Sequence, residues 1–421
     1  MNEQSQNSVS GTRSNSWKKQ IVLFLSGQTV SLFGSSLVQY AIVWHITLTT
    51  GSGLMMTIST LCGFLPQLLI SVFAGVWADR YSRKMLIMIA DGVIAASTLV
   101  LALLFLAGYQ DIWLLFIISG IRSLGSGVQT PAVNAMIPQI VPTDKLMRVN
   151  GINGSIQSLT TVLSPAISGA LLASAGIVST FFVDVITAAA AIGIMFTLKV
   201  KRLERTGPQE EKGHFQELRE GILYAWRHPF LKALIFAYSF FMFFVTPAAL
   251  ITPLLVTRTF GDEVWRLTLN EMLFGIGSIL GGVVIASWGG FRNRLRTIGL
   301  FSILFGLLTA ALGIPQNFWS YLFFMLLTGT CIPFISSPAM VLLQEITDPD
   351  KQGRIFSLVQ IIVTTVMPLG MVIFGPLSDI VSVELLLIFT GIVMAAIGAV
   401  VLLNKRYLPY GVRGETKPEE S

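Results

Sequence analysis

The stretch Gly75-Val76-Trp77-Ala78-Asp79-Arg80-Tyr81-Ser82-Arg83-Lys84 lies between two long apolar runs, residues 54–76 and 85–107. Each run is long enough to cross a bilayer as a helix, since about 20 residues suffice. One acid and three bases cannot lie in hydrocarbon, so the stretch must form a tight turn in water. Its positive excess predicts that this turn faces the cytoplasm. Gly75 would let neighbouring helices approach closely.

The composition indicates a membrane protein and excludes several other classes. Of 421 residues, 53% are hydrophobic and 12% charged, with a mean hydropathy of +0.72, whereas soluble domains have about 25% charged residues. The net charge of +6 does not indicate a nucleic-acid partner, because the bases gather in alternate loops. Cys62 and Cys331 fall inside predicted spans, so we expect neither a disulfide framework nor a metal cluster. With three His, no zinc-like spacing and no phosphate-binding Gly-Lys loop, the sequence predicts no metal, no cofactor and no enzyme.

Long apolar runs predict about twelve transmembrane helices, which makes the fold class an all-α integral membrane protein. The expected spans are 20–46, 54–77, 85–107, 112–137, 150–175, 178–198, 230–256, 267–289, 297–313, 318–343, 355–378 and 383–403. Of the 28 Lys and Arg residues, 25 lie in the termini or in loops on the side of the basic turn. This bias predicts that both termini are cytoplasmic.

An internal repeat divides the chain into two six-helix halves. Leu159-Thr-Thr-Val-Leu-Ser-Pro165 recurs as Val363-Thr-Thr-Val-Met-Pro368, and Asp144-Lys145-Leu-Met-Arg148 recurs as Asp350-Lys351-Gln-Gly-Arg354. Parallel halves around a midplane site are typical of one large class of transporters. We therefore predict a cytoplasmic N-terminal tail at 1–19, an N-terminal half at 20–199, a cytoplasmic linker with an amphipathic helix at 200–229, a C-terminal half at 230–404 and a cytoplasmic C-terminal tail at 405–421.

The basic turn resembles the Gly-x-x-x-Asp-Arg-x-x-Arg-Lys loop of the major facilitator superfamily, which lies between the second and third transmembrane helices. The resemblance implies the major facilitator fold and a conformational latch formed by Gly75, Asp79, Arg80, Arg83 and Lys84. A merely topogenic basic turn is the alternative. In the second half, Ala286 stands where Asp79 would, so the charged latch is present in one half only.

The chain also resembles the macrolide-efflux branch of bacterial drug–proton antiporters. The resemblance rests on short runs across the membrane part: Gly27-Gln-Thr-Val-Ser-Leu32, Thr50-Gly-Ser52, Gly63-Phe-Leu-Pro66, Ile121-Arg-Ser-Leu124, Thr130-Pro-Ala132-Val-Asn134-Ala135, Ser164-Pro-Ala166 and Gly353-Arg354-Ile-Phe-Ser-Leu358. It implies a plasma-membrane exporter of hydrophobic drugs that is driven by protons.

Ionisable residues inside the spans are candidates for proton coupling, because burying a charge in hydrocarbon is costly. Arg122 lies deep in the fourth span, and Arg122-Ser-Leu-Gly-Ser-Gly is similar to the superfamily's fourth-helix motif. Asp184 and Glu271 lie in the outer halves of their spans, and Asp184 is our first choice for the proton carrier. The alternative for Arg122 is a structural Arg that a carboxylate and backbone carbonyls satisfy. The alternative for the two acids is an interfacial cap or a static partner for Arg122 or Arg266. We expect Asp91, the next candidate, to pair with the basic turn two helical turns away.

The candidate substrate pocket is mostly apolar and aromatic, which suits a large amphipathic drug. Its candidate residues are Gln28, Gln39, Asn134, Gln157, Tyr238 and Phe241. The expected partners are a small hydrophobic drug, protons and the lipid bilayer, with no nucleic acid and no obligate protein partner. Export of another compound (a tetracycline-like drug, a siderophore or a metabolite), a uniporter or uptake carrier, and a non-transporting membrane scaffold or sensor are the alternatives.

Overall fold

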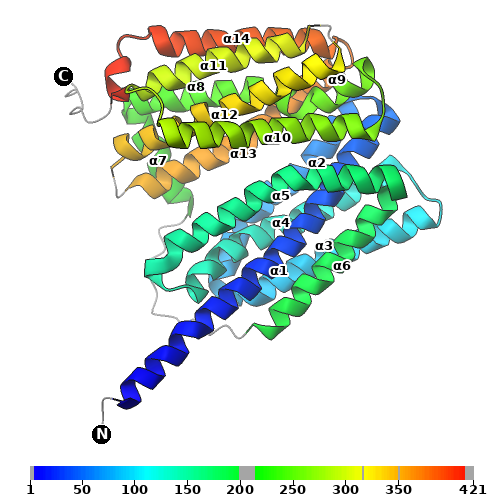
Figure 1. Ribbon diagram of the computed structural model, residues 1–421, viewed down its shortest axis with the longest axis vertical. Coiled ribbons are helices and arrows are strands. Elements are labelled where there is room, and N and C mark those ends of the chain that lie inside the picture. The colour runs from blue at the N-terminus through cyan, green and yellow to red at the C-terminus, as the bar shows by residue number, and fades with distance from the viewer. Residues whose placement is uncertain (1–3, 199–213, 315–316, 349–350, 413–421) are drawn as a thin grey trace. The chain divides into compact units, whose positions relative to one another are not determined.

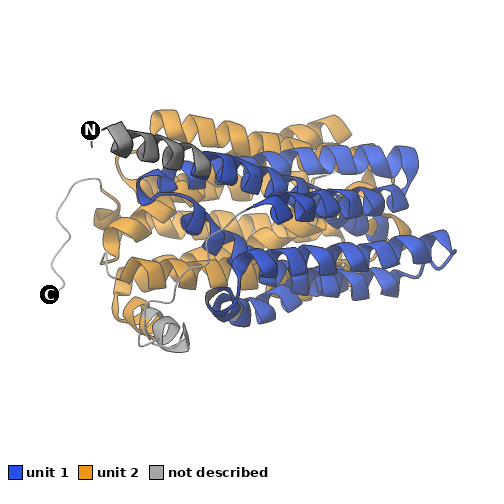
Figure 2. Ribbon diagram, turned by 90° about the horizontal axis from the view of Figure 1, so that it is seen from below, with its two compact units in different colours: residues 1–46, 58–205 blue, residues 47–57, 206–421 orange. Residues whose placement is uncertain are grey.

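The computed structural model describes residues 4–198, 214–314, 317–348 and 351–412 (Figure 1). These residues contain twelve helical stretches that are long and apolar enough to cross a membrane, which confirms the predicted fold class and the number of spans. By packing, the chain separates into two compact units (Figure 2). Unit 1 comprises residues 1–46 and 58–205, and unit 2 comprises residues 47–57 and 206–421.

The N-terminal six spans are single helices. They are α1 Gln4–Thr50, α2 Gly53–Arg80, α3 Arg83–Leu106, α4 Ile112–Ile140, α5 Leu146–Ala175 and α6 Ile177–Thr197. Helix α1 begins at Gln4, so the tail that we expected at 1–19 is largely part of this helix. The turn between α2 and α3 consists of two residues, Tyr81 and Ser82, and the tight basic turn of the sequence analysis is therefore present.

The remaining helices begin with the amphipathic segment that the spacing predicts between the halves, which forms α7 His214–Arg227. The others are α8 Pro229–Thr246, α9 Thr252–Thr259, α10 Val264–Trp288, α11 Arg294–Leu312, α12 Phe318–Ile346, α13 Gln352–Leu377 and α14 Val383–Leu403. The expected span 230–256 is not one regular helix. A π-helical turn, Pro247–Ile251, separates α8 from α9, because prolines at 247 and 253 remove backbone donors from this segment.

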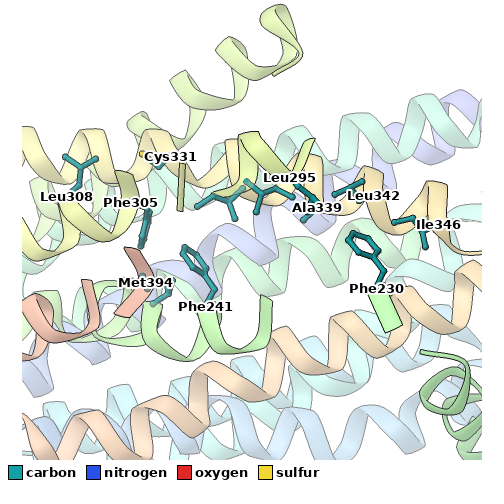
Figure 3. Close-up of a cluster of buried hydrophobic side chains, with 13 residues drawn as sticks. Phe230, Phe241, Leu295, Phe305, Leu308, Cys331, Ala339, Leu342, Ile346 and Met394 are labelled. Atoms are coloured by element: carbon teal, nitrogen blue, oxygen red, sulfur yellow. The ribbon is translucent and has the colours of Figure 1, made fainter. Parts of the chain in front are cut away.

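The core of unit 2 lies between α8, α11, α12 and α14 (Figure 3). The rings of Phe241 and Phe305 pack with their centroids 5.5 Å apart, next to the buried Met394. The C-terminal segment joins this core, since Tyr410 stacks on Phe230 with a centroid separation of 4.6 Å. The expected tail at 405–421 is thus folded in its described part, up to residue 412.

Glycines set the distance between helices within unit 2. A Cβ atom on Gly281 of α10 would lie 2.1 Å from the backbone oxygen of Thr330 on α12. A Cβ on Gly306 of α11 would lie 2.4 Å from the backbone oxygen of Gly391 on α14. Lipid competes with apolar side chains for helix surfaces, so close backbone approach through small residues is what favours helix association in a bilayer.

Two adjacent glycines allow a matched test of this packing. Gly281→Ala should lower the melting temperature of the purified protein, because its Cβ meets backbone that cannot move aside. Gly282→Ala should leave the melting temperature unchanged or raise it, because no heavy atom lies within 4 Å of the added Cβ and Ala favours a helix over Gly by about 1 kcal/mol. Equal melting temperatures for the two variants would contradict the assigned helix contact.

Candidate functional site

A buried ion pair joins two helices of unit 1. Arg122 on α4 binds Asp184 on α6 through a guanidinium nitrogen and a carboxylate oxygen, and the two side chains are 7% and 0% exposed. The same nitrogen donates to the Thr98 hydroxyl on α3. Both ions are paired and hydrogen-bonded, which is the condition under which charges are tolerated inside a membrane. The sequence identified Arg122 and Asp184 separately, and the structure brings them together.

The other oxygen of the Asp184 carboxylate is held from α1. Ser35 Oγ donates to Asp184 Oδ1 at 3.1 Å, Thr98 Oγ1 donates to Asp184 Oδ2 at 2.9 Å, and Arg122 Nη2 donates to the Ser35 backbone oxygen at 3.2 Å. The pair therefore has ligands from four helices, α1, α3, α4 and α6. Ser35 and Thr98 were missed because hydroxyl residues are common in membrane helices and satisfy their own helix backbone.

The glycines that follow Arg122 explain why it can lie so deep. A Cβ on Gly125 would lie 2.6 Å from Ile94 Cγ1 on α3, and a Cβ on Gly127 would lie 2.8 Å from the backbone oxygen of Gln67 on α2. Helix α4 is thus in close contact with both neighbours directly beyond Arg122. The small residues of the motif therefore allow α4 to pack closely against α2 and α3.

A second carboxylate, Asp91 on α3, is 1% exposed and lies in a neutral polar environment. Its Oδ1 accepts hydrogen bonds from Ser31 Oγ at 2.7 Å and Gln129 Nε2 at 2.6 Å. Its Oδ2 is buried and has no hydrogen-bond partner, and no Lys or Arg of the described chain forms an ion pair with it. Our expectation that Asp91 pairs with the basic turn is wrong.

The bases of the turn bind helix ends instead, since Lys84 Nζ donates to the backbone oxygens of Phe196 and Leu198 at 3.2 and 2.8 Å. Arg83 donates to the backbone oxygens of Ala78 at 3.1 Å and Ala135 at 2.8 Å. Cations at the carboxyl ends of α2 and α6 complement the helix dipoles there. These carbonyls attract the bases away from Asp91, and sequence spacing cannot reveal them.

The remaining latch residues are placed only in part. Arg80, the last residue of α2, is exposed, and Gly75 lies within α2 and is half-buried. The side chain of Asp79 falls outside the described atoms, so its predicted role stays a prediction.

Glu271 lies on α10, in unit 2, and is half-buried. Its Oε1 accepts from Asn270 Nδ2 at 3.3 Å, and Asn270 Oδ1 in turn accepts from the Tyr321 hydroxyl at 2.7 Å. Arg266, on the same helix, pairs with Glu263 at 2.9 Å. In the described part of unit 2, Glu271 therefore has an amide partner and no ion pair.

A cavity of about 370 Å³ in unit 2 contains the predicted Tyr238. Its walls come from α8, α12 and α13, and its polar groups include Ser336, Ser337 and Gln360, which the sequence analysis did not single out. An almost wholly apolar groove of about 500 Å³ lies between α7, α8 and α13 and is lined by Phe240, among others. Tyr238 is thus placed in a cavity wall whose chemistry suits an amphipathic molecule.

The other predicted pocket residues lie elsewhere. Phe241 is 3% exposed and belongs to the core cluster of unit 2, so its ring is packed in the core rather than open to a cavity. Gln28 is 9% exposed in unit 1, with Nε2 lacking a hydrogen-bond partner. Gln39, Asn134 and Gln157 are exposed residues of unit 1.

The comparisons with known proteins identify the family. The profile of the Major Facilitator Superfamily matches residues 24–368 and 265–421, and the chain belongs to this superfamily. It is 28% identical to Macrolide efflux protein A of Streptococcus pyogenes, over 92% of this chain and 96% of that protein. It is 22% identical to Multidrug efflux pump Tap of Mycolicibacterium fortuitum, over 93% and 97% of the two chains.

A solved structure supports the fold. The chain is similar to the crystal structure of the nucleoside transporter NupG with a TM-score of 0.69 and 14% sequence identity, over 92% of this chain and 98% of that one. Membership of the superfamily, together with the twelve apolar helices of the described residues, makes the protein a multi-pass membrane transporter. The resemblance to the superfamily that the sequence motifs indicated is confirmed.

Removal of one member of the Arg122–Asp184 pair should be more damaging than removal of both. Arg122→Gln or Asp184→Asn leaves an uncompensated buried charge, a loss of about 3–5 kcal/mol. The double variant leaves two neutral polar groups, so its melting temperature should exceed that of either single variant. Melting temperatures of the purified proteins check this, and a double variant less stable than both single variants would contradict the pairing.

Proposed function

We propose that this chain exports hydrophobic drugs, macrolide-type antibiotics among them, from bacterial cells in exchange for protons. The efflux proteins that it resembles over most of its length support the substrate class. The apolar cavity walls around Tyr238, with few polar groups, suit such molecules. Transport proceeds by alternating access, as the pseudo-symmetric halves of this fold allow, and needs no cofactor and no obligate protein partner.

The chain lies in the bacterial plasma membrane with both termini in the cytoplasm. The concentration of Lys and Arg in the termini and in alternate loops supports this orientation. Protons then arrive from the face opposite to the basic turn.

The observation that carries proton coupling is the contrast between the two buried carboxylates of unit 1. Asp184 forms a buried ion pair with Arg122. Asp91 has no cation, and a buried carboxylate without one binds a proton instead of remaining charged. Asp91 is therefore the proton carrier in this conformation, and Asp184 becomes available as a carrier only when its pair with Arg122 opens.

One helix connects the two carboxylates. Ser31, which binds Asp91, and Ser35, which binds Asp184, are four residues apart on α1 and so lie on one face of it. Asp91 and Thr98 are two turns apart on α3, also on one face. A rotation or shift of α1 would break both serine contacts at once, which couples protonation to the conformational change.

The energetics are sufficient for one proton per neutral drug molecule. A charge that crosses 100 mV contributes about 2.3 kcal/mol, whereas a tenfold concentration ratio costs about 1.4 kcal/mol. For a monocationic drug exchanged one for one, only the pH gradient remains as the driving force.

Glu271 is a second carrier candidate, in unit 2, since it too has no ion pair among the described residues.

Asp91→Asn should separate drug movement from proton movement. The amide resembles the protonated acid in size and charge, so exchange of drug down its own gradient should persist. Uphill accumulation of a labelled macrolide in everted vesicles with an imposed pH gradient should fall at least about tenfold, equivalent to about 1.4 kcal/mol of lost coupling. Asp111→Asn, which changes an exposed acid at the start of α4, is the control and should transport normally.

Three outcomes would contradict parts of this proposal. Normal uphill transport by Asp91→Asn assigns the proton to another group, and Glu271→Gln is then the variant to measure. Wild-type vesicles that only equilibrate the drug across the membrane, without accumulating it and without dissipating the pH gradient, would exclude antiport and leave a uniporter. A wild-type chain that protects a pump-deficient host from no compound in a drug panel would exclude drug export.

The latch formed by Gly75, Asp79, Arg80, Arg83 and Lys84 belongs to the same cycle. Arg83 and Lys84 fix the turn to helix ends within unit 1. Asp79→Asn should abolish most drug efflux from intact cells while the amount of protein in the membrane stays normal. Wild-type efflux from this variant would refute the latch.

A further inference from the structure

The residues that join α1 to α2 pack within unit 2. Residues 47–57 belong to this unit, although α2 continues into unit 1 from Ile58 onward (Figure 2). The contacts centre on Asp379, which follows α13. Its Oδ1 accepts from the Gly53 amide at 2.7 Å, and its Oδ2 accepts from the Leu54 amide at 2.9 Å and from Ser52 Oγ at 2.8 Å.

Asp379 therefore caps the first turn of α2 from a distant part of the chain. The amides at a helix N-terminus have no partner within the helix and attract negative charge. A helix usually supplies its own cap from the preceding residue. Here Ser52 occupies that position, and its hydroxyl accepts from the Met55 amide at 3.4 Å and donates to Asp379.

Arg258, near the end of α9, holds the same site from its other side. It donates to Asp379 Oδ1 at 2.9 Å, to the Ser378 backbone oxygen at 2.6 Å and to the Gly51 backbone oxygen at 2.7 Å. Gly51 has a φ of +55°, a left-handed conformation that presents its carbonyl to Arg258. Charge-assisted hydrogen bonds of this kind are about twice as strong as neutral ones.

Close helix packing lies directly beneath the polar contacts. A Cβ on Gly53 would lie 2.1 Å from the Gly375 backbone oxygen, and a Cβ on Gly375 would lie 1.8 Å from Thr57 Oγ1. Thr57 is 3% exposed and donates to the Met371 backbone oxygen at 3.1 Å. The start of α2 and the end of α13 thus meet with no space for a side chain between them.

We propose that Asp379 and Arg258 form an outer clamp that grips the N-terminus of α2 and must release it for drug to leave the cell. The clamp lies at the end of α2 opposite to the basic turn, and therefore on the outer face in the orientation proposed above. This inference rests on the proposed function for its place in the transport cycle. Asp379 and Arg258 act as positioning residues, since they hold the helix and touch neither drug nor proton carrier.

Asp379 is suited to a clamp that does not respond to pH, and not to a proton sensor. Partial burial favours its protonated form, but hydrogen bonds from Leu54, Gly53, Ser52 and Arg258 outweigh this and hold the pKa below the ordinary value of 3.8. A depressed folded pKa means that the clamp has its full strength at neutral pH and weakens only as the pH falls through that low value. Opening must therefore come from motion of the helices rather than from protonation of Asp379.

The test measures access to the site beneath the clamp, without drug or proton gradient. In a chain with Cys62→Ala and Cys331→Ala, Thr57→Cys is the reporter, and a membrane-impermeant maleimide is added to intact cells. Adding Asp379→Asn or Arg258→Gln should raise the labelling rate at residue 57 about tenfold or more, because the anchored state loses about 1.4 kcal/mol or more. Gly53→Val, which keeps every polar group but blocks the close approach, should have the same effect.

Glu263→Gln is the matched control, because this half-exposed acid pairs locally with Arg266 and lies outside the clamp. It should label at the rate of the reporter chain. Unchanged labelling in all three clamp variants, with normal amounts of folded protein, would overturn the clamp. Labelling in everted vesicles but not in intact cells would overturn its outer location. If the clamp variants label fast while the wild-type chain exports no drug, the clamp stands and the proposed function fails.

Discussion

Hydrocarbon offers no hydrogen-bond partner, so every charge within the membrane must find its partner inside the protein. This constraint organises unit 1. The Arg122–Asp184 pair draws ligands from α1, α3, α4 and α6, and any arrangement that separated these helices would expose a charge to lipid. The pair thus specifies how the helices of unit 1 pack, although buried pairs contribute little net stability compared with apolar side chains of equal volume.

Close contact between backbones is the second requirement, and glycine meets it in both units. Gly125 and Gly127 bring α4 against α3 and α2, and Gly281 brings α10 against α12. The close helix contact that glycine allows occurs in two different settings. In the core of unit 2 it brings α10 against α12, whereas at Gly53 and Gly375 the close contact lies next to the hydrogen bonds of Asp379. Lipid tails pack against apolar helix surfaces as well as other helices do. Hydrogen bonds next to a glycine contact therefore determine which two helices form it.

The fold could be predicted almost entirely from the sequence, since twelve apolar runs and one basic turn leave little choice of architecture. Arg122 and Asp184 were found because ionisable residues in spans are rare, but their pairing needed the helix arrangement. The error over Asp91 has a clear cause. Lys84 is two turns away in sequence, yet its ammonium group binds carbonyls at the end of α6, which lies far along the chain. Contacts between a side chain and distant backbone atoms cannot be predicted from the sequence, because every residue type has the same backbone carbonyl.

The proposed proton coupling at Asp91 has an electrical consequence. In the proposed cycle, the Arg122–Asp184 ion pair has no net charge and protonated Asp91 has none, so these groups together carry no net charge into the membrane field. The proposal therefore makes a conformational change in this state insensitive to the membrane potential. After Asp91 releases its proton in that cycle, the same helices carry one negative charge, and the proposal makes their return the voltage-dependent half of the cycle. The membrane potential would then change the rate of one half-cycle and leave the other unaffected.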